Sequence, residues 1–347
     1  MKGRGATWNP QNRFERLEYV VDDEAHVDPE SIGVSPNTIY LRDPSRTIIA
    51  TNDSPDIGFD ASINPYRGCE HGCIYCYARP SHEYLGFSAG LEFETRILVK
   101  EDAPVLLREE LNRKSWEPKV IAISGVTDPY QPIERKMRIT RGCLEVLADF
   151  RNPCGVITKN HLVTRDVDVL AELAKYNCAQ VFLSITTLDA SLQQKMEPRT
   201  ASPELRLEAL ATLSAAGIPV GVMVAPVVPG LTDHEMPAIL AAAKKAGATR
   251  AGFVVLRLPY AVAPLMEQWL EEQFPDRKEK VLNRVRSLRG GKLYDAKWGV
   301  RGKGEGIFAE QIQALFDVAC RKHGLNEDRV ELSTEHFRRR LAQASLF

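Results

Sequence analysis

The sequence lacks the features that would place the protein in a membrane or outside the cell. None of its apolar runs reaches the roughly 18 residues that a membrane-spanning helix needs. The N-terminal stretch, MKGRGATWNPQNRFERLEY, has no apolar segment and no small-residue cleavage site, which excludes a secretory signal. We therefore expect a cytoplasmic protein with no membrane partner. In that compartment its seven cysteines should be reduced rather than paired.

The sequence also lacks an excess of charge, internal repeats and low-complexity tracts. The net charge over 347 residues is −1, which excludes a global electrostatic attraction to nucleic acid. Basic residues do gather in the C-terminal third, which ends in the run Arg338-Arg339-Arg340. Because the total charge is balanced, a solvated helical surface explains this run better than a nucleic-acid-binding face.

The pattern of apolar residues divides the chain into three parts. Residues 1–57 are polar and interrupted by prolines, which predicts an irregular N-terminal extension. From residue 58 to about 260, short apolar runs rich in β-branched residues alternate with helical patterns, which predicts buried parallel strands. Residues 261–347 predict a mainly helical C-terminal cap, with helices over 265–289 and 307–323. The predicted strands cover residues 120–123, 155–158, 180–185, 220–224 and 252–256.

Four helices are predicted between these strands. They cover residues 140–151 with Thr140 as N-cap, 166–177, 203–216 and 233–246. With one more strand before residue 69, the chain contains six βα units, so we expect an α/β fold with a parallel sheet. Six units fit either an open doubly wound sheet or a partial (β/α)6 barrel. In both folds the functional side chains lie at the carboxyl ends of the strands.

Three cysteines in one short loop, Cys69, Cys73 and Cys76, have the spacing C-x₃-C-x₂-C. Three thiolates hold three irons of a four-iron cluster, because each thiolate binds one iron. The fourth iron is then open and can bind a substrate or cofactor. The other four cysteines are scattered, and we expect them to be small buried side chains.

A structural zinc site is the alternative, with His71 or His82 as the fourth ligand. It would make the protein a zinc-stabilised, non-enzymatic module that binds nucleic acid through its C-terminal basic residues. Zinc-binding thiolates commonly come as C-x₂-C pairs, however, and this triplet has no second pair. The sequence therefore favours an iron–sulfur cluster.

The cysteine loop resembles the signature of the radical S-adenosylmethionine (radical SAM) enzymes, including Tyr75 directly before the last cysteine. The resemblance implies a partial (β/α)6 TIM-like barrel and a [4Fe–4S] cluster on Cys69, Cys73 and Cys76. It implies that the open iron chelates S-adenosylmethionine. One electron, from a donor such as flavodoxin or ferredoxin, then gives methionine and a 5′-deoxyadenosyl radical. The protein supplies ligation, orientation and exclusion of water.

A closer likeness links three consecutive strand ends, residues 124–129, 156–159 and 182–185, to the spore photoproduct lyase branch. Side chains at these ends contact S-adenosylmethionine in that branch, and the matching positions are Thr127, Lys159 and Ser184. The two hydroxyls would bond the ribose or the amino acid end, and Lys159 would face the carboxylate. Asp128 would accept from the cofactor's ammonium group or simply start a turn. Tyr75 would pack near the adenine.

One position departs from the lyase pattern. In the lyase, a cysteine in the segment equivalent to 124–126 donates the hydrogen that quenches the product radical, whereas this chain has Gly125. Nothing in the sequence places Cys143 at the strand end instead. We therefore predict a radical SAM enzyme of a sister group, with a DNA or RNA base as the substrate by analogy. Glu197 and Arg199 either reach the substrate or cofactor or form a salt bridge at the rim.

Overall fold

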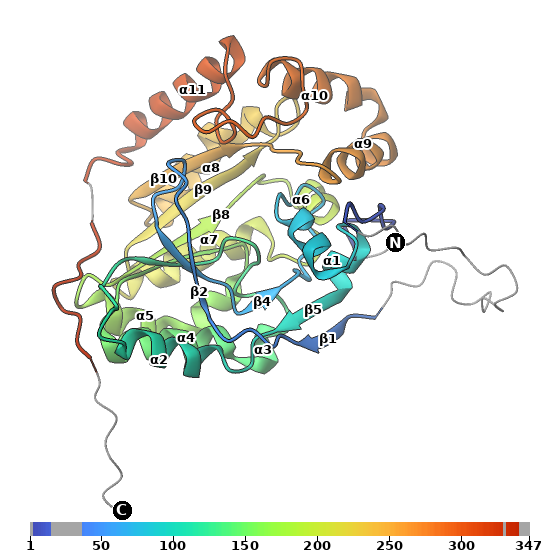
Figure 1. The fold of residues 1–347 in the computed structure, drawn as a ribbon. Helices are drawn as coiled ribbons and strands as arrows, with labels where there is room; N and C mark the ends of the chain where they lie inside the picture. Colours follow the sequence, from blue (N-terminus) through green and yellow to red (C-terminus); the bar gives the residue numbers. More distant parts are fainter. Residues whose placement is uncertain (1–2, 15–36, 329–330, 340–347) are drawn as a thin grey trace, which may run out of the picture.

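The computed structural model describes residues 3–14, 37–328 and 331–339. Its main feature is a seven-stranded sheet in the order β10-β9-β8-β7-β6-β3-β2 (Figure 1). Strands β3 to β10 in this sheet are parallel, and β2 (Ile49–Thr51) pairs antiparallel with β3 at the edge. The parallel strands are β3 (Ala61–Ile63), β6 (Ile121–Ile123), β7 (Cys154–Thr158), β8 (Ala179–Ser184), β9 (Val220–Val227) and β10 (Arg250–Val255).

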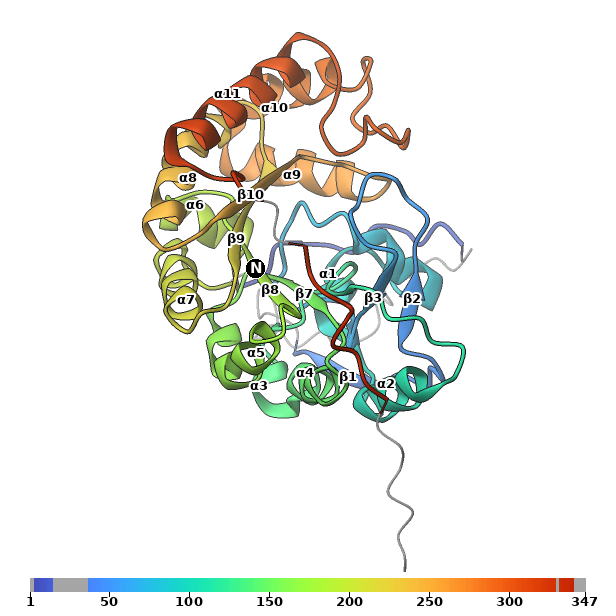
Figure 2. The ribbon, with the colours of Figure 1, turned by 90° about the vertical axis from the view of Figure 1, so that its left-hand side faces the viewer.

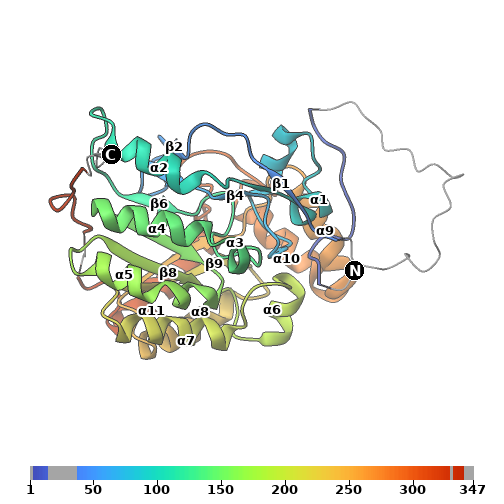
Figure 3. The same cartoon turned by 90° about the horizontal axis from the view of Figure 1, so that it is seen from below.

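The six parallel strands stand side by side in chain order. This order is that of a barrel, because a doubly wound sheet reverses direction at a switch point. The α/β prediction and the partial (β/α)6 barrel are therefore confirmed. Helices cover the outer face of the sheet in succession (Figure 3). They are α2 (Ala103–Asn112), α3 (Glu134–Met137), α4 (Ile139–Phe150), α5 (Val167–Ala174), α6 (Ala190–Met196), α7 (Pro203–Ala215) and α8 (Met236–Lys245).

Helix boundaries follow the local capping residues. Helix α7 begins after Ser202, whose hydroxyl accepts from the Leu205 N–H at 3.3 Å, and the chain turns away at Gly217 with φ +76°. The predicted N-cap of α4 was wrong. Arg138, at φ +55°, precedes that helix, while the Thr140 hydroxyl donates to the Pro129 carbonyl at 2.6 Å. A tertiary hydrogen bond therefore engages the Thr140 hydroxyl, which the local sequence predicted to cap the helix.

The N-terminal stretch is less irregular than expected, since residues 37–57 contribute two short strands. Strand β1 (Ile39–Arg42) pairs parallel with β5 (Arg96–Val99), and β4 (Tyr66–Arg67) pairs with the other edge of β5. The pairing falls between Pro36 and Pro44, where an Ile-Tyr-Leu run leaves its N–H groups available. The boundaries 1–57, 58–260 and 261–347 remain predictions.

Three helices follow the last strand and gather beyond β10 (Figures 1 and 2). They are α9 (Val262–Gln273), α10 (Pro275–Ser287) and α11 (Ile307–His323). Residues 265–289, predicted as mostly helical, belong to two helices that meet at Phe274, because Pro275 cannot continue a helix but can begin one. None of the helices in the described parts of the chain has the length and apolar character to cross a membrane.

The C-terminal segment 331–339 lies at the amino ends of the strands. The Ser333 N–H donates to the Asn177 carbonyl at 2.9 Å, just before β8 begins. Arg338 donates to the Asp149 carbonyl and Arg339 to the Trp116 carbonyl, both at 2.9 Å. These two arginines therefore fasten the segment to the end of the sheet opposite the cysteine loop. Arg340 lies outside the described residues.

Candidate active site at the cysteine loop

The cysteine loop follows β4 and leads into a short 3₁₀ helix, η2 (Arg79–Leu85). Its glycines have positive φ, +78° at Gly68 and +66° at Gly72. A Cβ on Gly68 would lie 2.9 Å from the Phe93 carbonyl oxygen, and a Cβ on Gly72 would lie 2.7 Å from Glu94 Oε2. Only glycine therefore lets the loop pack this tightly against α1 (Leu91–Thr95).

The three loop cysteines are free thiols turned away from bulk solvent. Cys69 and Cys73 are buried and Cys76 is half-buried. Burial raises the pKa of Cys73 well above its ordinary range and that of Cys76 to about 11. Such thiols become thiolates only beside a compensating positive charge, which a metal centre provides. The loop therefore fits an iron–sulfur cluster.

The same loop does not have the geometry of a single-ion site. Within the described ranges, no group of three or more His, Cys, Asp or Glu side chains is arranged to hold one metal ion. A four-iron cluster has no such requirement, because each thiolate binds its own iron. The candidate zinc histidines have other neighbours. His71 Nε2 is 3.0 Å from Asn160 Nδ2, and the His82 ring packs against Phe87 and Phe93.

Thr127 joins the end of β6 to the start of the cysteine loop. Its hydroxyl donates to the Gly68 carbonyl at 2.8 Å and accepts from Gln131 Nε2 at 2.9 Å. Gly125, two residues earlier, has φ +133° and accepts from the Tyr77 hydroxyl at 2.6 Å. This backbone conformation favours glycine, so the main chain here disfavours a cysteine at this position. Cys143 does not replace it, because its thiol lies in the core on α4.

Asp128 connects three neighbouring segments. One oxygen accepts from the Thr158 hydroxyl at 2.6 Å and the Tyr130 N–H at 2.9 Å. The other accepts from the Lys159 N–H at 2.8 Å and lies 3.4 Å from His71 Nδ1. The carboxylate thus holds the ends of β6 and β7 against the cysteine loop. It also makes the turn contact, to Tyr130, that its sequence context predicts.

Lys159 and Tyr75 meet at one buried carboxylate, that of Glu197. Lys159 Nζ lies 3.7 Å from Glu197 Oε1 and donates to the Ala225 carbonyl at 2.8 Å. The Tyr75 hydroxyl donates to Glu197, and Lys159 Nζ lies 5.8 Å from the Tyr75 ring centre. The Thr186 hydroxyl donates to the same carboxylate at 2.7 Å. Side chains from β7, the strand end of β8 and the cysteine loop therefore share one anion.

Glu197 is fully buried and also forms an ion pair with the buried Arg206 of α7. Burial alone would raise the pKa of Glu197, but the charges of Arg206 and Lys159 outweigh it and lower the pKa to about 2. Main-chain bonds place Glu197 here, since the Ile74 N–H donates to the Met196 carbonyl at 3.0 Å. The segment after α6 thus runs alongside the cysteine loop.

Ser184 ends β8 and is buried. Its main-chain carbonyl accepts from Arg206 Nη1 at 2.8 Å. Arg199 pairs instead with Glu70 of the cysteine loop at 3.0 Å. Glu197 and Arg199 both form salt bridges in the structure, which is one of the two roles considered for them.

Sequence reasoning missed several residues that shape this site. Glu94, Arg79 and Arg206 are buried ionic side chains, and no periodicity or motif distinguishes them from exposed ones. The run Met196-Glu197-Pro198-Arg199-Thr200 did carry a signal, because polar residues there follow a strand end. Residues 4–6, which contact the loop, carried none.

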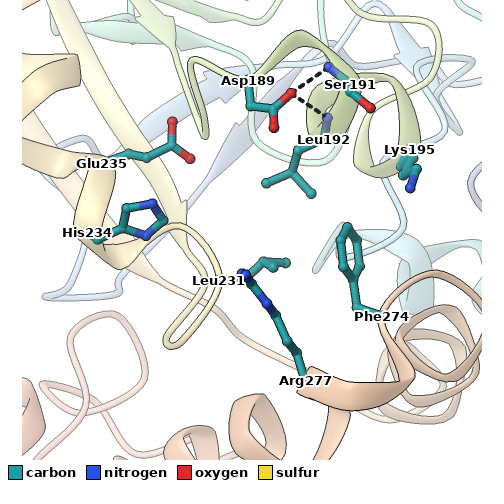
Figure 4. A pocket seen from close by; sticks show the side chains of 9 residues that line it. All are labelled: Asp189, Ser191, Leu192, Lys195, Leu231, His234, Glu235, Phe274 and Arg277. Carbon is teal, nitrogen blue, oxygen red and sulfur yellow. Dashed lines mark hydrogen bonds between the residues drawn. The ribbon is translucent and has the colours of Figure 1, made fainter.

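A pocket of about 510 Å³ lies away from these residues, between α6 and the start of α10 (Figure 4). The Asp189 carboxylate in its wall caps α6 through the N–H groups of Ser191 and Leu192. Lys195, His234 and Arg277 line other sides. No cysteine and no predicted cofactor contact lines this pocket, so it is separate from the site at the strand ends.

Comparison with known proteins places this geometry in a family. Residues 63–243 match the family model described as the Radical SAM superfamily. An uncharacterized protein of Mycobacterium tuberculosis is 36% identical over 232 residues, covering 66% of this chain and 67% of that protein. An uncharacterized protein of Methanocaldococcus jannaschii is 34% identical over 173 residues, covering 50% of this chain and 62% of that protein.

Among solved structures, a spore photoproduct lyase complexed with a dinucleoside spore photoproduct has the same fold. It aligns with a TM-score of 0.60 at 17% identity, over 82% of this chain and 80% of that chain. Membership of the matched family implies S-adenosylmethionine and an iron–sulfur cluster. The family model covers the cysteine loop and strands β6 to β9 with their carboxyl ends, and the chain belongs to the Radical SAM superfamily.

Proposed function

We propose that the protein is an enzyme that reductively cleaves S-adenosylmethionine at a [4Fe–4S] cluster held by Cys69, Cys73 and Cys76. The observation that carries the proposal is three free, shielded thiols in one loop beside the carboxyl ends of a Radical SAM barrel. When bound, the cluster and S-adenosylmethionine supply the radical chemistry, with one electron from a donor such as flavodoxin or ferredoxin.

The residues of this chain would bind and orient the cofactor. Lys159 offers a cation and Ser184 a hydroxyl at adjacent strand ends, and these suit a carboxylate and a ribose or amino group. Tyr75 and Glu197 would hold Lys159 at the strand end until the cofactor binds. Thr127 and Asp128 are committed to the cysteine loop and to β7, so we assign them to positioning the loop next to the cofactor. The part that Thr127 and Asp128 play is therefore indirect.

Anaerobic reconstitution with iron and sulfide tests this function. The wild-type protein should gain about four irons per chain and, with dithionite and S-adenosylmethionine, form 5′-deoxyadenosine. Cys73→Ala should lose both properties. Cys320→Ala is the matched control, since it also removes a buried free thiol, but from α11. A colourless wild-type protein with stoichiometric zinc, or an intact cluster that yields no 5′-deoxyadenosine, contradicts the proposal.

We propose a nucleic-acid base as the substrate class. A relative from Pseudomonas phage M6 is named a radical SAM Nalpha-GlyT isomerase and is 26% identical over 175 residues, covering 49% of this chain and 34% of that protein. The solved lyase binds a dinucleoside. In this chain, Tyr77 and Tyr260 follow the cysteine loop and β10, with exposed fractions of 49% and 58%. Arg257 lies 4.9 Å from the Tyr77 ring centre, and Arg13 lies 3.8 Å from that of Tyr260.

Aromatic faces interleaved with arginine are typical of surfaces that stack the bases of single strands. Fluorescence anisotropy with labelled single-stranded DNA and RNA measures binding directly. Tyr260→Ala should weaken binding by about 1–3 kcal/mol. Phe308→Ala removes an exposed ring of α11 that lies beside Arg284, and it should leave binding unchanged. Equal binding by both variants contradicts this substrate class. Transfer of deuterium from a labelled oligonucleotide into 5′-deoxyadenosine would identify the base.

A further inference from the structure

We propose that residues 4–12, the N-terminal strap, are part of the cluster site and hold the cysteine loop in the shape that the cluster needs. The inference rests on the proposed function, and it assigns positioning residues that lie far from the cysteine motif in sequence. Figure 1 shows this dark-blue segment beside α1.

The strap touches the cysteine loop through main-chain atoms. A Cβ on Gly5 would lie 1.7 Å from the Gly72 carbonyl oxygen and 3.1 Å from the Ile74 nitrogen. No side chain fits there without moving one of the two backbones. Ala6, the next residue, is fully buried. The strap therefore meets the loop on both sides of Cys73 in sequence.

A second connection runs through two buried charges. The N–H groups of Gly5 and Ala6 donate to the Glu94 carboxylate at 3.1 and 2.8 Å. The same carboxylate pairs with Arg79 at 2.5 Å. Arg79 donates through Nε and Nη2 to the Cys73 carbonyl, at 3.1 and 2.9 Å. The strap thus contacts the residues on either side of the central cysteine directly, and it reaches the Cys73 carbonyl through Glu94 and Arg79.

The remainder of the strap is fastened to the elements that follow the loop. The Leu91 N–H donates to the Trp8 carbonyl at 3.2 Å, and the Glu92 N–H donates to Asn9 Oδ1 at 3.0 Å. These contacts satisfy N–H groups in the first turn of α1, which have no partner within the helix. Asn12 Nδ2 donates to the carbonyls of Glu83 and Phe87, both at 3.0 Å.

These contacts reach the loop backbone and not the thiols, so the strap positions the cluster and does not ligate it. The potential of an iron–sulfur cluster depends on hydrogen bonds near its sulfurs and on solvent exposure. A loosened strap changes both, because it frees the main chain of residues 72–74 and admits water. The expected signs are faster loss of iron and a shifted midpoint potential.

Gly5→Ala tests the strap, and Gly58→Ala is the matched control because a Cβ there meets no atom within 4 Å. Both proteins are reconstituted with iron and sulfide and exposed to a chelator under anaerobic conditions. Loss of the two Gly5 and Ala6 hydrogen bonds should make Gly5→Ala release iron about tenfold faster than wild type. Its midpoint potential and the electron paramagnetic resonance of its reduced cluster should also shift, while Gly58→Ala matches wild type.

The outcomes separate the two proposals. A wild-type protein that takes up no iron overturns both. If the wild-type protein takes up iron and Gly5→Ala has the same iron release, midpoint potential and spectrum as wild type, only the proposal about the strap is overturned. If Gly5→Ala does not fold, the milder double variant Asn9→Ala/Asn12→Ala replaces it, since it removes side-chain bonds only. Iron release from this double variant at the wild-type rate also overturns the strap.

Discussion

Two buried carboxylates, Glu94 and Glu197, lie beside the cysteine loop, and their partners differ in kind. Each is fully buried and each pairs with a buried arginine, Arg79 or Arg206. The other partners of Glu94 include the main-chain N–H groups of the strap. The other partners of Glu197 are the side chains of Tyr75, Thr186 and Lys159.

The difference separates a carboxylate held by main-chain donors from one held only by side chains. A buried carboxylate needs compensating partners, and each of these has them. Main-chain donors cannot turn away, so Glu94 holds a permanent structure. Side chains can exchange one partner for another when a ligand arrives, so under the proposed function Lys159 would exchange Glu197 for a cofactor carboxylate. We therefore expect substitutions around Glu94 to affect stability and cluster retention, and those around Glu197 to affect cofactor binding.

The largest effect is expected from Arg79→Met, which removes the arginine that pairs with Glu94. Removing one partner of a buried ion pair leaves an uncompensated charge and costs about 3–5 kcal/mol. Urea denaturation of the cluster-free protein measures this loss. Arg113→Met is the control, because Arg113 is exposed and its surface pair with the half-buried Glu110 contributes less than about 1 kcal/mol. Equal stability of the two variants would remove the distinction between the two carboxylates.

Lys159→Met tests the Glu197 side and should change affinity rather than iron content. Loss of a charge-assisted hydrogen bond of about 1.5–3 kcal/mol predicts roughly ten- to hundredfold weaker binding of S-adenosylmethionine. Equilibrium dialysis against the loaded protein measures it. Lys244→Met is matched, since Lys244 Nζ also donates to a main-chain carbonyl, that of Gly324 at 2.7 Å, but on α8. If Lys159→Met lost iron but kept its affinity for S-adenosylmethionine, Lys159 would act in cluster retention and not in cofactor binding.

A third effect concerns acid stability. The pKa of Glu197 falls from an ordinary 4.5 to about 2 in the folded protein. A carboxyl group with a lowered pKa stabilises the fold above its unfolded pKa, and this contribution is lost as the pH falls from about 5 towards 2. Glu197→Gln has no such group, so its free energy of unfolding should depend less on pH in that window. Parallel pH dependences of the two proteins would contradict the lowered pKa.

The fold and the centre of the site were predictable from the sequence because their signals are local. Short β-branched runs identified the parallel strands, and the spacing of Cys69, Cys73 and Cys76 identified the loop. The rule that strand ends carry the site predicted Thr127, Lys159 and Ser184, which lie at or just beyond the ends of β6, β7 and β8. Their contacts to a cofactor remain predictions.

The supporting residues were not predictable, since their partners are distant in the chain. Ala6 and Glu94 are 88 residues apart, and Tyr75 and Glu197 are 122 residues apart. A charged residue destined for burial looks the same in sequence as an exposed one. Strand β1 was missed for the same reason, because it exists only through its pairing with β5.

The long separations also set an order of events during synthesis. A chain leaves the ribosome from its N-terminus, so the strap appears first and Arg206 appears about 200 residues later. Until α7 has emerged, Glu94 can already pair with Arg79, whereas Glu197 still lacks its arginine. The Glu94 side of the loop can therefore form before the Glu197 side, and the two ion pairs enter the folding chain at different times.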